Sequence, residues 1–274
     1  MNIAIIGCGY IGLDIAKTLA HKGHRLTATT LRAEDLPLLS KVVQKSSFSK
    51  GNHEEEFAPL ILNNEALLIT YTADAPEHLE TESLQMARTL RQLALEMDLP
   101  RDLIYLSTTS IYGDHGGLWV DETGELLAKN DPAKLLIETE KLYTSLAELG
   151  WSVCVLRLAE IYGPGKELSK RVRELKGLVL PGLGNQYTNM VHKSDCSAAM
   201  DYALRHHLEG VFNVADDDHL WRKDLYDQIA QKLGLPKVKW DPSLTGLHGG
   251  NKRVSNHKIK AAGFAFRHPH RVLD

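Results

Sequence analysis

Asn2-Ile3-Ala4-Ile5-Ile6-Gly7-Cys8-Gly9-Tyr10-Ile11-Gly12 is the stretch that decides the fold. An apolar run of strand length passes into a Gly-x-Gly-x-x-Gly turn, after which a helix is expected to begin. In such a turn the first glycine permits the sharp bend, the second lets the backbone approach a pyrophosphate, and the third allows close packing of helix on strand. The helix N-terminus attracts the phosphate charge. The residues predicted to hold a dinucleotide are therefore Gly7, Gly9, Tyr10, Ile11 and Gly12, although ordinary strand-to-helix turns also contain glycines.

The end of the next predicted strand, Arg25–Thr30, indicates which dinucleotide is bound. About 20 residues after the glycines, NAD-binding proteins place an acidic residue on the ribose hydroxyls. This chain has Thr30 there, followed closely by Arg32. A guanidinium can donate a pair of charged hydrogen bonds to a 2′-phosphate. We therefore expect NADP, held by Arg32 and Thr30. NAD remains the alternative, because Glu34 and Asp35 lie just beyond, and Arg32 could also be a solvated loop residue.

Composition narrows the class of protein. The chain has 274 residues and a formal net charge of −3, so it can bury a large core but has no basic excess for nucleic acid. No apolar run reaches transmembrane length, and the first residues read as a strand rather than a signal peptide. Three cysteines, an odd number, fit a reducing compartment. We expect a cytoplasmic protein with no nucleic-acid or membrane partner. No histidine stands in a metal-ligand pattern, so no metal site is predicted.

Apolar runs of strand length alternate with helical stretches, which is typical of a parallel sheet with crossover helices. The fold predicted is α/β, a Rossmann doubly wound parallel sheet with a smaller C-terminal region that caps the substrate. We expect the Rossmann core to span residues 1–160, and residues 161–274 to cover the cleft while returning some elements to the core. The further strands expected are Ala66–Thr70, Leu103–Ser107 and Val153–Leu158, and the helices Ile11–Lys22, Glu80–Glu96 and Ala133–Leu149.

Later motifs add a family resemblance. They are Leu106–Gly113 (LSTTSIYG), Arg157–Gly165 (RLAEIYGPG), Val191–Asp195 (VHKSD), Val211–Asp216 (VFNVAD) and Lys252–Asn256 (KRVSN). With the glycine turn, they make the chain resemble the extended and atypical short-chain dehydrogenase/reductases, close to the NAD-dependent epimerase/dehydratase group, over nearly its whole length. The resemblance implies a Rossmann fold, a nicotinamide dinucleotide and a small-molecule substrate.

The resemblance also implies roles for single residues. Thr108 lies four residues before Tyr112 and matches the active-site Ser/Thr of the family. Ser107 and Thr108 end a parallel strand, where ligands of open α/β sheets bind, so their hydroxyls can hold a substrate oxygen beside the nicotinamide or cap a turn. Tyr162 begins a turn that lies near the nicotinamide in the family. His192 belongs to the segment expected over the substrate cleft.

The catalytic Tyr-x-x-x-Lys pair of the family is missing. Aligning Glu140 with the family's glutamate on this helix places Pro132 at the tyrosine position and Leu136 at the lysine position. Lys134 lies two residues away from the latter, about 200° around a helix, and cannot simply replace it. Tyr112 and His192 remain as proton donors, although both residue types also serve structural roles.

The function expected is an NADP-dependent oxidoreductase or epimerase-like enzyme acting on a small polar substrate such as a sugar or nucleotide sugar. The alternative is a non-catalytic NADP(H)-binding protein that regulates or senses redox state. We also expect a weak homodimer through Glu80–Glu96 and Ala133–Leu149, because consecutive Leu135, Leu136 and Ile137 point around more than one helical face.

Overall fold

The computed structural model describes residues 1–49, 54–70, 79–97, 101–244 and 250–273. The chain divides into two compact units whose segments interleave. Unit 1 comprises Met1–Thr108, Asn130–Arg157 and Cys196–Phe212, and unit 2 comprises Thr109–Lys129, Leu158–Asp195 and Asn213–Asp274. The predicted boundary divides the chain at the single point of residue 160, whereas each of these units combines three separate segments of the sequence.

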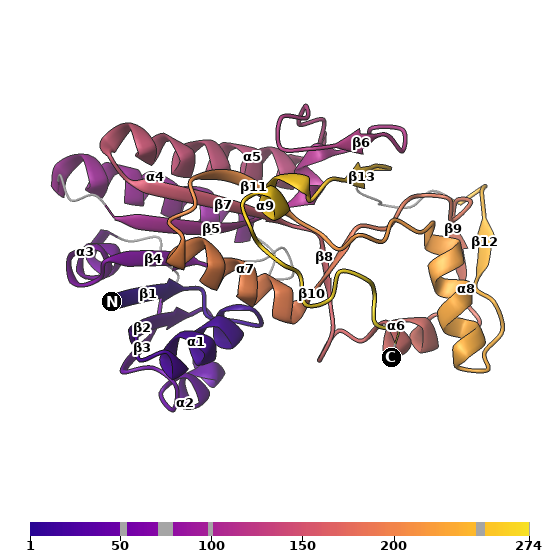
Figure 1. The fold of residues 1–274 in the computed structure, drawn as a ribbon, viewed down its shortest axis with the longest axis horizontal. Helices are drawn as coiled ribbons and strands as arrows, with labels where there is room; N and C mark the ends of the chain where they lie inside the picture. Colours follow the sequence, from indigo (N-terminus) through magenta and orange to yellow (C-terminus); the bar gives the residue numbers. More distant parts are fainter. Residues whose placement is uncertain (50–53, 71–78, 98–100, 245–249, 274) are drawn as a thin grey trace. The chain divides into compact units, whose positions relative to one another are not determined.

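A seven-stranded parallel sheet forms the centre of unit 1, in the order β11-β7-β5-β4-β1-β2-β3 (Figure 1). The glycine turn follows β1, which pairs with β2 on one side and β4 on the other. This arrangement confirms the predicted Rossmann fold. The strands are β1 Asn2–Ile6, β2 Arg25–Thr30, β3 Lys45–Phe48, β4 Ala66–Ile69, β5 Asp102–Thr108, β7 Ser152–Leu158 and β11 Gly210–Val214.

Helices cover both faces of this sheet (Figure 1). On one face, α3 (Glu54–Asn63), α4 (Leu79–Met97) and α5 (Asp131–Thr144) pack on a core that includes Ile6 and Leu67. The other face carries α1 (Gly12–His21) and α7 (Lys193–Arg205). The short elements of this unit are η1 Ala33–Asp35, α2 Leu36–Leu39 and η3 Ser145–Leu149.

Local signals set the helix ends. Gly23 and Gly150, each with φ near 79°, occupy the left-handed region just after α1 and η3, where a residue with a Cβ would be strained. The side chain of Asn130 caps α5 by accepting the backbone N–H of Ala133 at 3.0 Å. The helix predicted over Ala133–Leu149 is α5 followed by the 3₁₀ turn η3.

Unit 2 is built from short parallel strand pairs and short helices. β8 (Glu160–Tyr162) pairs with β10 (Met190–His192), β9 (Val179–Pro181) with β12 (Lys239–Asp241), and β6 (Trp119–Val120) with β13 (Arg253–Val254). Its hydrophobic core joins α6 (Leu168–Glu174) to α8 (Arg222–Lys232). The remaining elements are η2 Thr109–Tyr112 and α9 His257–Ala261.

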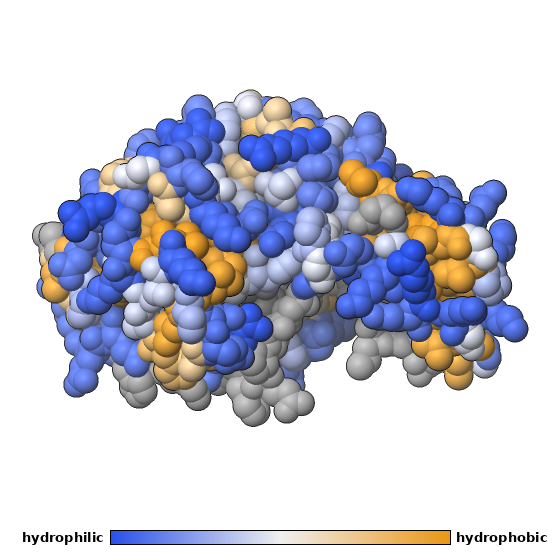
Figure 2. Space-filling view, turned by 90° about the horizontal axis from the view of Figure 1, so that it is seen from below, coloured by the Kyte–Doolittle hydropathy of each residue, from blue (hydrophilic) through white to orange (hydrophobic). Residues whose placement is uncertain are grey.

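The surface of unit 2 is partly apolar near β9. Leu178, Val179 and Leu183 are about half exposed, at 53, 47 and 58%, and apolar side chains gather at this end of the unit in Figure 2. Among the described residues, no helix has both the length and the apolar character needed to cross a membrane.

Candidate functional site

The glycine turn after β1 has the geometry of a phosphate-binding loop. Gly7 takes a φ of 79°, which only glycine adopts without strain. Its N–H donates to Thr29 Oγ1 at 3.2 Å, and the N–H of Cys8 donates to the carbonyl of Thr29 at 2.7 Å. The end of β2 therefore holds the turn in place. The Cys8 thiol is buried, and burial raises its pKa to about 12, which keeps it in the protonated form near neutral pH.

Gly9 and Gly12 have opposite surroundings. Among the described residues, a Cβ on Gly9 would meet the carbonyl oxygen of Gly7 alone, at 3.9 Å. A Cβ on Gly12 would lie 2.6 Å from Thr70 Oγ1 and 3.3 Å from the same carbonyl. Open space at the second glycine and close packing at the third are what a dinucleotide turn requires.

The start of α1 also fits a bound phosphate. Its N-cap is Ile11, an apolar residue that is 1% exposed and has no side-chain acceptor for the first N–H groups of the helix. The N–H groups of Leu13 and Asp14 already donate to the carbonyls of Gly9 and Ile11 at 2.9 and 3.0 Å, so it is the positive end of the helix dipole that favours a phosphate here. The turn therefore has the shape that a dinucleotide requires, and the contact of Gly7, Gly9, Tyr10, Ile11 and Gly12 with a pyrophosphate stays a prediction.

Arg32 lies at the surface directly after β2. Its guanidinium is paired with Asp35, and its side chain is 58% exposed. Thr30 is 2% exposed, and its hydroxyl accepts the backbone N–H of Arg32 at 3.2 Å. The structure thus shows that Thr30 fixes the backbone of Arg32, while Asp35 binds the guanidinium that a 2′-phosphate would need. Their predicted contact with a 2′-phosphate stays a prediction.

Ser107 belongs to a buried ionic network at the end of β5. Its hydroxyl donates to Glu140 Oε2 at 2.8 Å, and Arg157 Nε donates to the two oxygens of Glu140 at 3.1 and 3.2 Å. The Glu140 and Arg157 side chains are 6 and 5% exposed. Thr108, the next residue, is half-buried and closes the strand. The network therefore fixes the strand end that carries Thr108.

Tyr112 is completely buried in unit 2. Its hydroxyl donates to Asn213 Oδ1 at 2.8 Å, while the Asn213 side-chain amide donates to the carbonyl of Ser255 at 3.1 Å. The backbone N–H of Asn213 in turn donates to Glu122 at 2.7 Å. These contacts give Tyr112 a structural task, and its predicted role as proton donor stays a prediction.

His192 belongs to a polar cluster at the start of α7. Its Nδ1 lies 2.8 Å from Ser194 Oγ, which lies 3.2 Å from His268 Nδ1. His268 Nδ1 lies 3.1 Å from Asp195 Oδ2. The two imidazole rings face each other with centroids 3.8 Å apart. Ligand atoms of His192, Asp195 and His268 all lie within 4.8 Å of one another, a grouping that sequence spacing did not indicate.

Tyr162 contacts the C-terminal segment of the chain. Its ring is 1% exposed, and its hydroxyl accepts the backbone N–H of Val272 at 3.4 Å. Burial raises the pKa of its hydroxyl to about 12. Nearby, Arg271 donates to Asp216 at 3.1 Å, and both side chains are almost fully buried. The predicted contact of Tyr162 with the nicotinamide is not tested by these distances.

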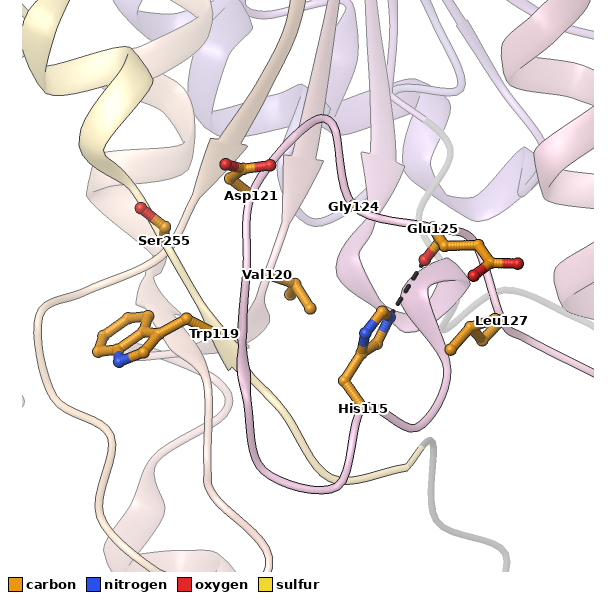
Figure 3. A pocket seen from close by; sticks show the side chains of 8 residues that line it. All are labelled: His115, Trp119, Val120, Asp121, Gly124, Glu125, Leu127 and Ser255. Atoms are coloured by element: carbon orange, nitrogen blue, oxygen red, sulfur yellow. Dashed lines mark hydrogen bonds between the residues drawn. The ribbon is translucent and has the colours of Figure 1, made fainter.

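A pocket of about 510 Å³ opens in unit 2 beside β6 (Figure 3). The Nε2 atom of His115 lies 3.1 Å from the backbone carbonyls of Tyr112 and Glu125. Carbonyls only accept, so His115 Nε2 carries a hydrogen and donates it. The pocket is lined by His115, Trp119, Val120, Asp121, Gly124, Glu125, Leu127 and Ser255.

A row of aromatic and cationic side chains adjoins this pocket through Trp119. The Arg253 guanidinium stacks on the rings of Trp119 and Tyr187, at 5.0 and 4.9 Å. Tyr187 neighbours Trp221 at 6.4 Å, and Lys223 lies 4.8 Å over the Trp221 ring. Trp119 and Trp221 are 55 and 39% exposed. The row offers flat apolar faces beside positive charge.

The positions of the missing Tyr–Lys pair lie on α5. Pro132 stands in the first turn of this helix, and Leu136 is half-buried one turn later. Lys134 forms an exposed pair with Asp131 at 3.1 Å. Neither Pro132 nor Leu136 can transfer a proton, so α5 lacks that catalytic device.

Comparison with known proteins places this geometry in a family. The model of the NAD dependent epimerase/dehydratase family matches residues 3–215, and the chain belongs to that family. It is 28% identical to Protein YeeZ of Escherichia coli (strain K12), over 98% of this chain and 96% of that one.

Solved structures show the same fold. A functionally unknown conserved protein from Silicibacter pomeroyi DSS is 25% identical with a TM-score of 0.80, covering 98% of this chain and 94% of the other. A dTDP-glucose 4,6-dehydratase from Bacillus anthracis str. Ames in complex with NAD is 17% identical with a TM-score of 0.80, covering 98 and 92%. The predicted resemblance is confirmed.

Proposed function

We propose that the protein is an NADP-dependent oxidoreductase or epimerase-like enzyme that acts on a small polar substrate. The observation that carries this proposal is the turn after β1, open at Gly9 and closely packed at Gly12. Bound there, the dinucleotide would supply a hydride donor or acceptor. The NAD complex of the Bacillus anthracis structure supports a nicotinamide cofactor.

The preference for NADP rests on Arg32. Thr30 fixes the backbone of Arg32 at the end of β2. Thr30 has no carboxylate, so this position lacks the acidic side chain that binds ribose hydroxyls in NAD-binding proteins. The Arg32 guanidinium is exposed and can turn from Asp35 to a 2′-phosphate. NAD remains the alternative, since Asp35 could accept ribose hydroxyls if Arg32 stays paired.

At the reacting centre, Thr108 orients the substrate oxygen, and Tyr112 or His192 supplies the proton. The network of Ser107, Glu140 and Arg157 supports the strand end at Thr108. General acid catalysis contributes roughly 10²–10⁴-fold. Removing the true donor should lower kcat by about that factor and leave NADPH affinity unchanged.

The aromatic and cationic row supports a nucleotide sugar as the substrate class. Exposed Trp119 and Trp221 can stack on a base or a sugar face, while Arg253 and Lys223 provide charge for phosphates. The Bacillus anthracis structure is that of a dTDP-glucose dehydratase. The pocket beside Trp119 gives room for a sugar.

A second candidate function is binding without turnover, as a redox sensor or regulatory protein. The observation that favours it is Pro132 and Leu136 at the positions of the catalytic pair. NADPH consumption over a panel of aldehydes, ketones and nucleotide sugars separates the two. Turnover that falls in Thr108→Ala, Tyr112→Phe or His192→Ala, but not in Tyr202→Phe on α7, supports the enzyme. Tight NADPH binding with no turnover on the panel favours the sensor.

We further propose a weak homodimer through α4 and α5. Leu135, Leu136 and Ile137 are all half-buried within the chain, so apolar surface remains for a partner. Light scattering at increasing protein concentration tests this, and a mass that stays near 30.5 kDa contradicts it.

A further inference from the structure

We propose that Ser194 and His268 are positioning residues that hold neutral His192 with its proton on Nε2, so that His192 works as a hydrogen-bond donor through that nitrogen. The inference rests on the proposed function, in which His192 belongs to the reacting centre. Ser194 and His268 were not singled out from the sequence.

The backbone of Ser194 fixes the role of one His192 nitrogen. The Ser194 amide nitrogen lies 3.2 Å from His192 Nδ1 and donates to it. A backbone N–H can only donate, so Nδ1 must present its lone pair. A neutral imidazole with a bare Nδ1 carries its hydrogen on Nε2.

The side chains around Ser194 support the same protonation of His192. Asp195 is completely buried and accepts the backbone N–H groups of Arg267 and His268 at 2.7 and 3.0 Å. As a carboxylate it only accepts, so His268 Nδ1, at 3.1 Å, holds a proton and donates. His268 Nδ1 has one hydrogen, which Asp195 Oδ2 and the Ser194 oxygen, at 3.2 Å, can share. The Ser194 hydroxyl can then donate its own hydrogen to the lone pair of His192 Nδ1 at 2.8 Å, which it shares with the Ser194 N–H.

The rest of the His192 ring is held by packing. The Tyr162 ring meets it edge-on at 5.3 Å, and the His268 ring lies against it at 3.8 Å. Its Nε2 edge lies over Gly163, where a Cβ would stand 2.7 Å from Nε2. Gly163 has a φ of 120°. Because Gly163 has no Cβ, the Nε2 edge of the His192 ring can pack against its backbone, and this contact fixes the position of Nε2.

The charged groups near the His192 ring bind other partners. Asp195, on α7, binds His268 rather than His192, and Asp216 and Arg271 affect the Tyr162 hydroxyl. Both carboxylates already accept hydrogen bonds from the C-terminal segment. Two donors of Ser194, its hydroxyl and its backbone N–H, lie within hydrogen-bond distance of His192 Nδ1.

A shared metal ion explains the same cluster less well. Imidazoles that bind one tetrahedral ion diverge from it, whereas these two rings face each other at 3.8 Å with an interplanar angle of 34°. The hydrogen bonds already engage the Nδ1 atoms of both histidines. Directed hydrogen bonding is therefore the reading that the distances favour.

Nitrogen-15 NMR of the full chain, labelled at histidine and free of ligand, tests the proposal directly. The two ring nitrogens of a neutral histidine give separate signals that identify the protonated one. His192→Gln assigns the signals. We expect His192 at pH 8 with the proton on Nε2, a shifted Nδ1 signal in Ser194→Ala, and a smaller shift in His268→Phe, which keeps a ring in the stack.

Ser197→Ala is the matched control, because the Ser197 hydroxyl lies on the same helix but donates to Asp14 at 2.8 Å. It should leave the His192 signals unchanged. A proton on Nδ1 in the wild type, or an unmoved Nδ1 signal in Ser194→Ala, overturns the proposal. So does stoichiometric Zn²⁺ that shifts both His192 and His268. The measurement needs no turnover, so a protein that shows the Nε2 tautomer but never uses NADPH refutes the proposed function alone.

Discussion

Arg32 directs two nitrogens at a single oxygen of Asp35, with Nε at 2.8 Å and Nη2 at 2.7 Å from Oδ2. The residue that we assign to the 2′-phosphate is thus held by a carboxylate three residues further on. Because the pair is exposed, it contributes only about 0.2–1 kcal/mol. A charged contact with phosphate is stronger, at roughly 1.5–3 kcal/mol.

Arg32→Ala should therefore weaken NADPH binding by roughly 10- to 100-fold and leave NADH affinity nearly unchanged. Asp35→Asn should strengthen NADPH binding by up to about 5-fold, because the guanidinium loses its competitor. Calorimetry measures both. Arg88→Ala, which breaks an exposed pair with Glu138 on α5, is the control. Equal losses for NADH and NADPH in Arg32→Ala would refute the assignment of Arg32.

Gly9→Val should abolish dinucleotide binding in a protein that still folds. Within the part of the chain that the structure describes, a Cβ at Gly9 meets one atom, at 3.9 Å, so the new side chain would fill the space proposed for the ligand. Gly12→Ala should instead destabilise the chain, since its Cβ would stand 2.6 Å from Thr70 Oγ1. Thermal unfolding and NADPH titration separate the two effects. A folded Gly9→Val protein with normal affinity would show that the turn is not the nucleotide site.

Breaking the pair of Glu140 and Arg157 should cost about 3–5 kcal/mol of unfolding free energy, because a buried charge is left without its partner. Arg157→Met tests this by urea denaturation at pH 7. Arg88→Met removes one partner of a pair whose side chains are 54 and 49% exposed, and should cost at most about 1 kcal/mol. Similar costs for the two variants would contradict the role given to the buried network.

His219 should make the protein less stable in acid. Burial, with Arg271 and Arg253 nearby, lowers its pKa to about 4. Between that value and about 6.5 the unfolded chain binds more protons than the folded chain, so the unfolding free energy falls as the pH drops through this window.

Because the ring is partly exposed, we expect an effect on the order of 1–2 kcal/mol between pH 7 and pH 4. Urea denaturation at both values measures it. His219→Gln should reduce the difference between the two, whereas His206→Gln at an exposed position should not. An unchanged pH dependence in His219→Gln would exclude His219 as its cause.

Local sequence signals predicted the core of the fold. β2 spans the expected Arg25–Thr30, and α1 lies within the expected Ile11–Lys22. Hydrophobic periodicity and the glycine spacing act over a few residues, so they can be read directly from the chain. The strands β3 and β11 were not predicted. β3 is short and its side chains are mostly exposed, so it lacks a clear apolar pattern.

The polar clusters could not be predicted in the same way. Asp195 and His268 are 73 residues apart, and Ser107 and Glu140 are 33 apart. Nothing in the local spacing of such residues indicates that they meet. The row formed by Trp119, Arg253 and Tyr187 likewise joins three distant segments, and only the fold brings these rings together.

The central claim is an NADP site built on the turn after β1, and calorimetric titration of the wild-type chain with NADPH and with NADH tests it most directly. We predict saturable binding of both at one site per chain, with NADPH the tighter by about 10-fold or more, from the contact energy expected of Arg32. NADH binding as tightly as NADPH or more tightly, or no binding of either, would contradict the account.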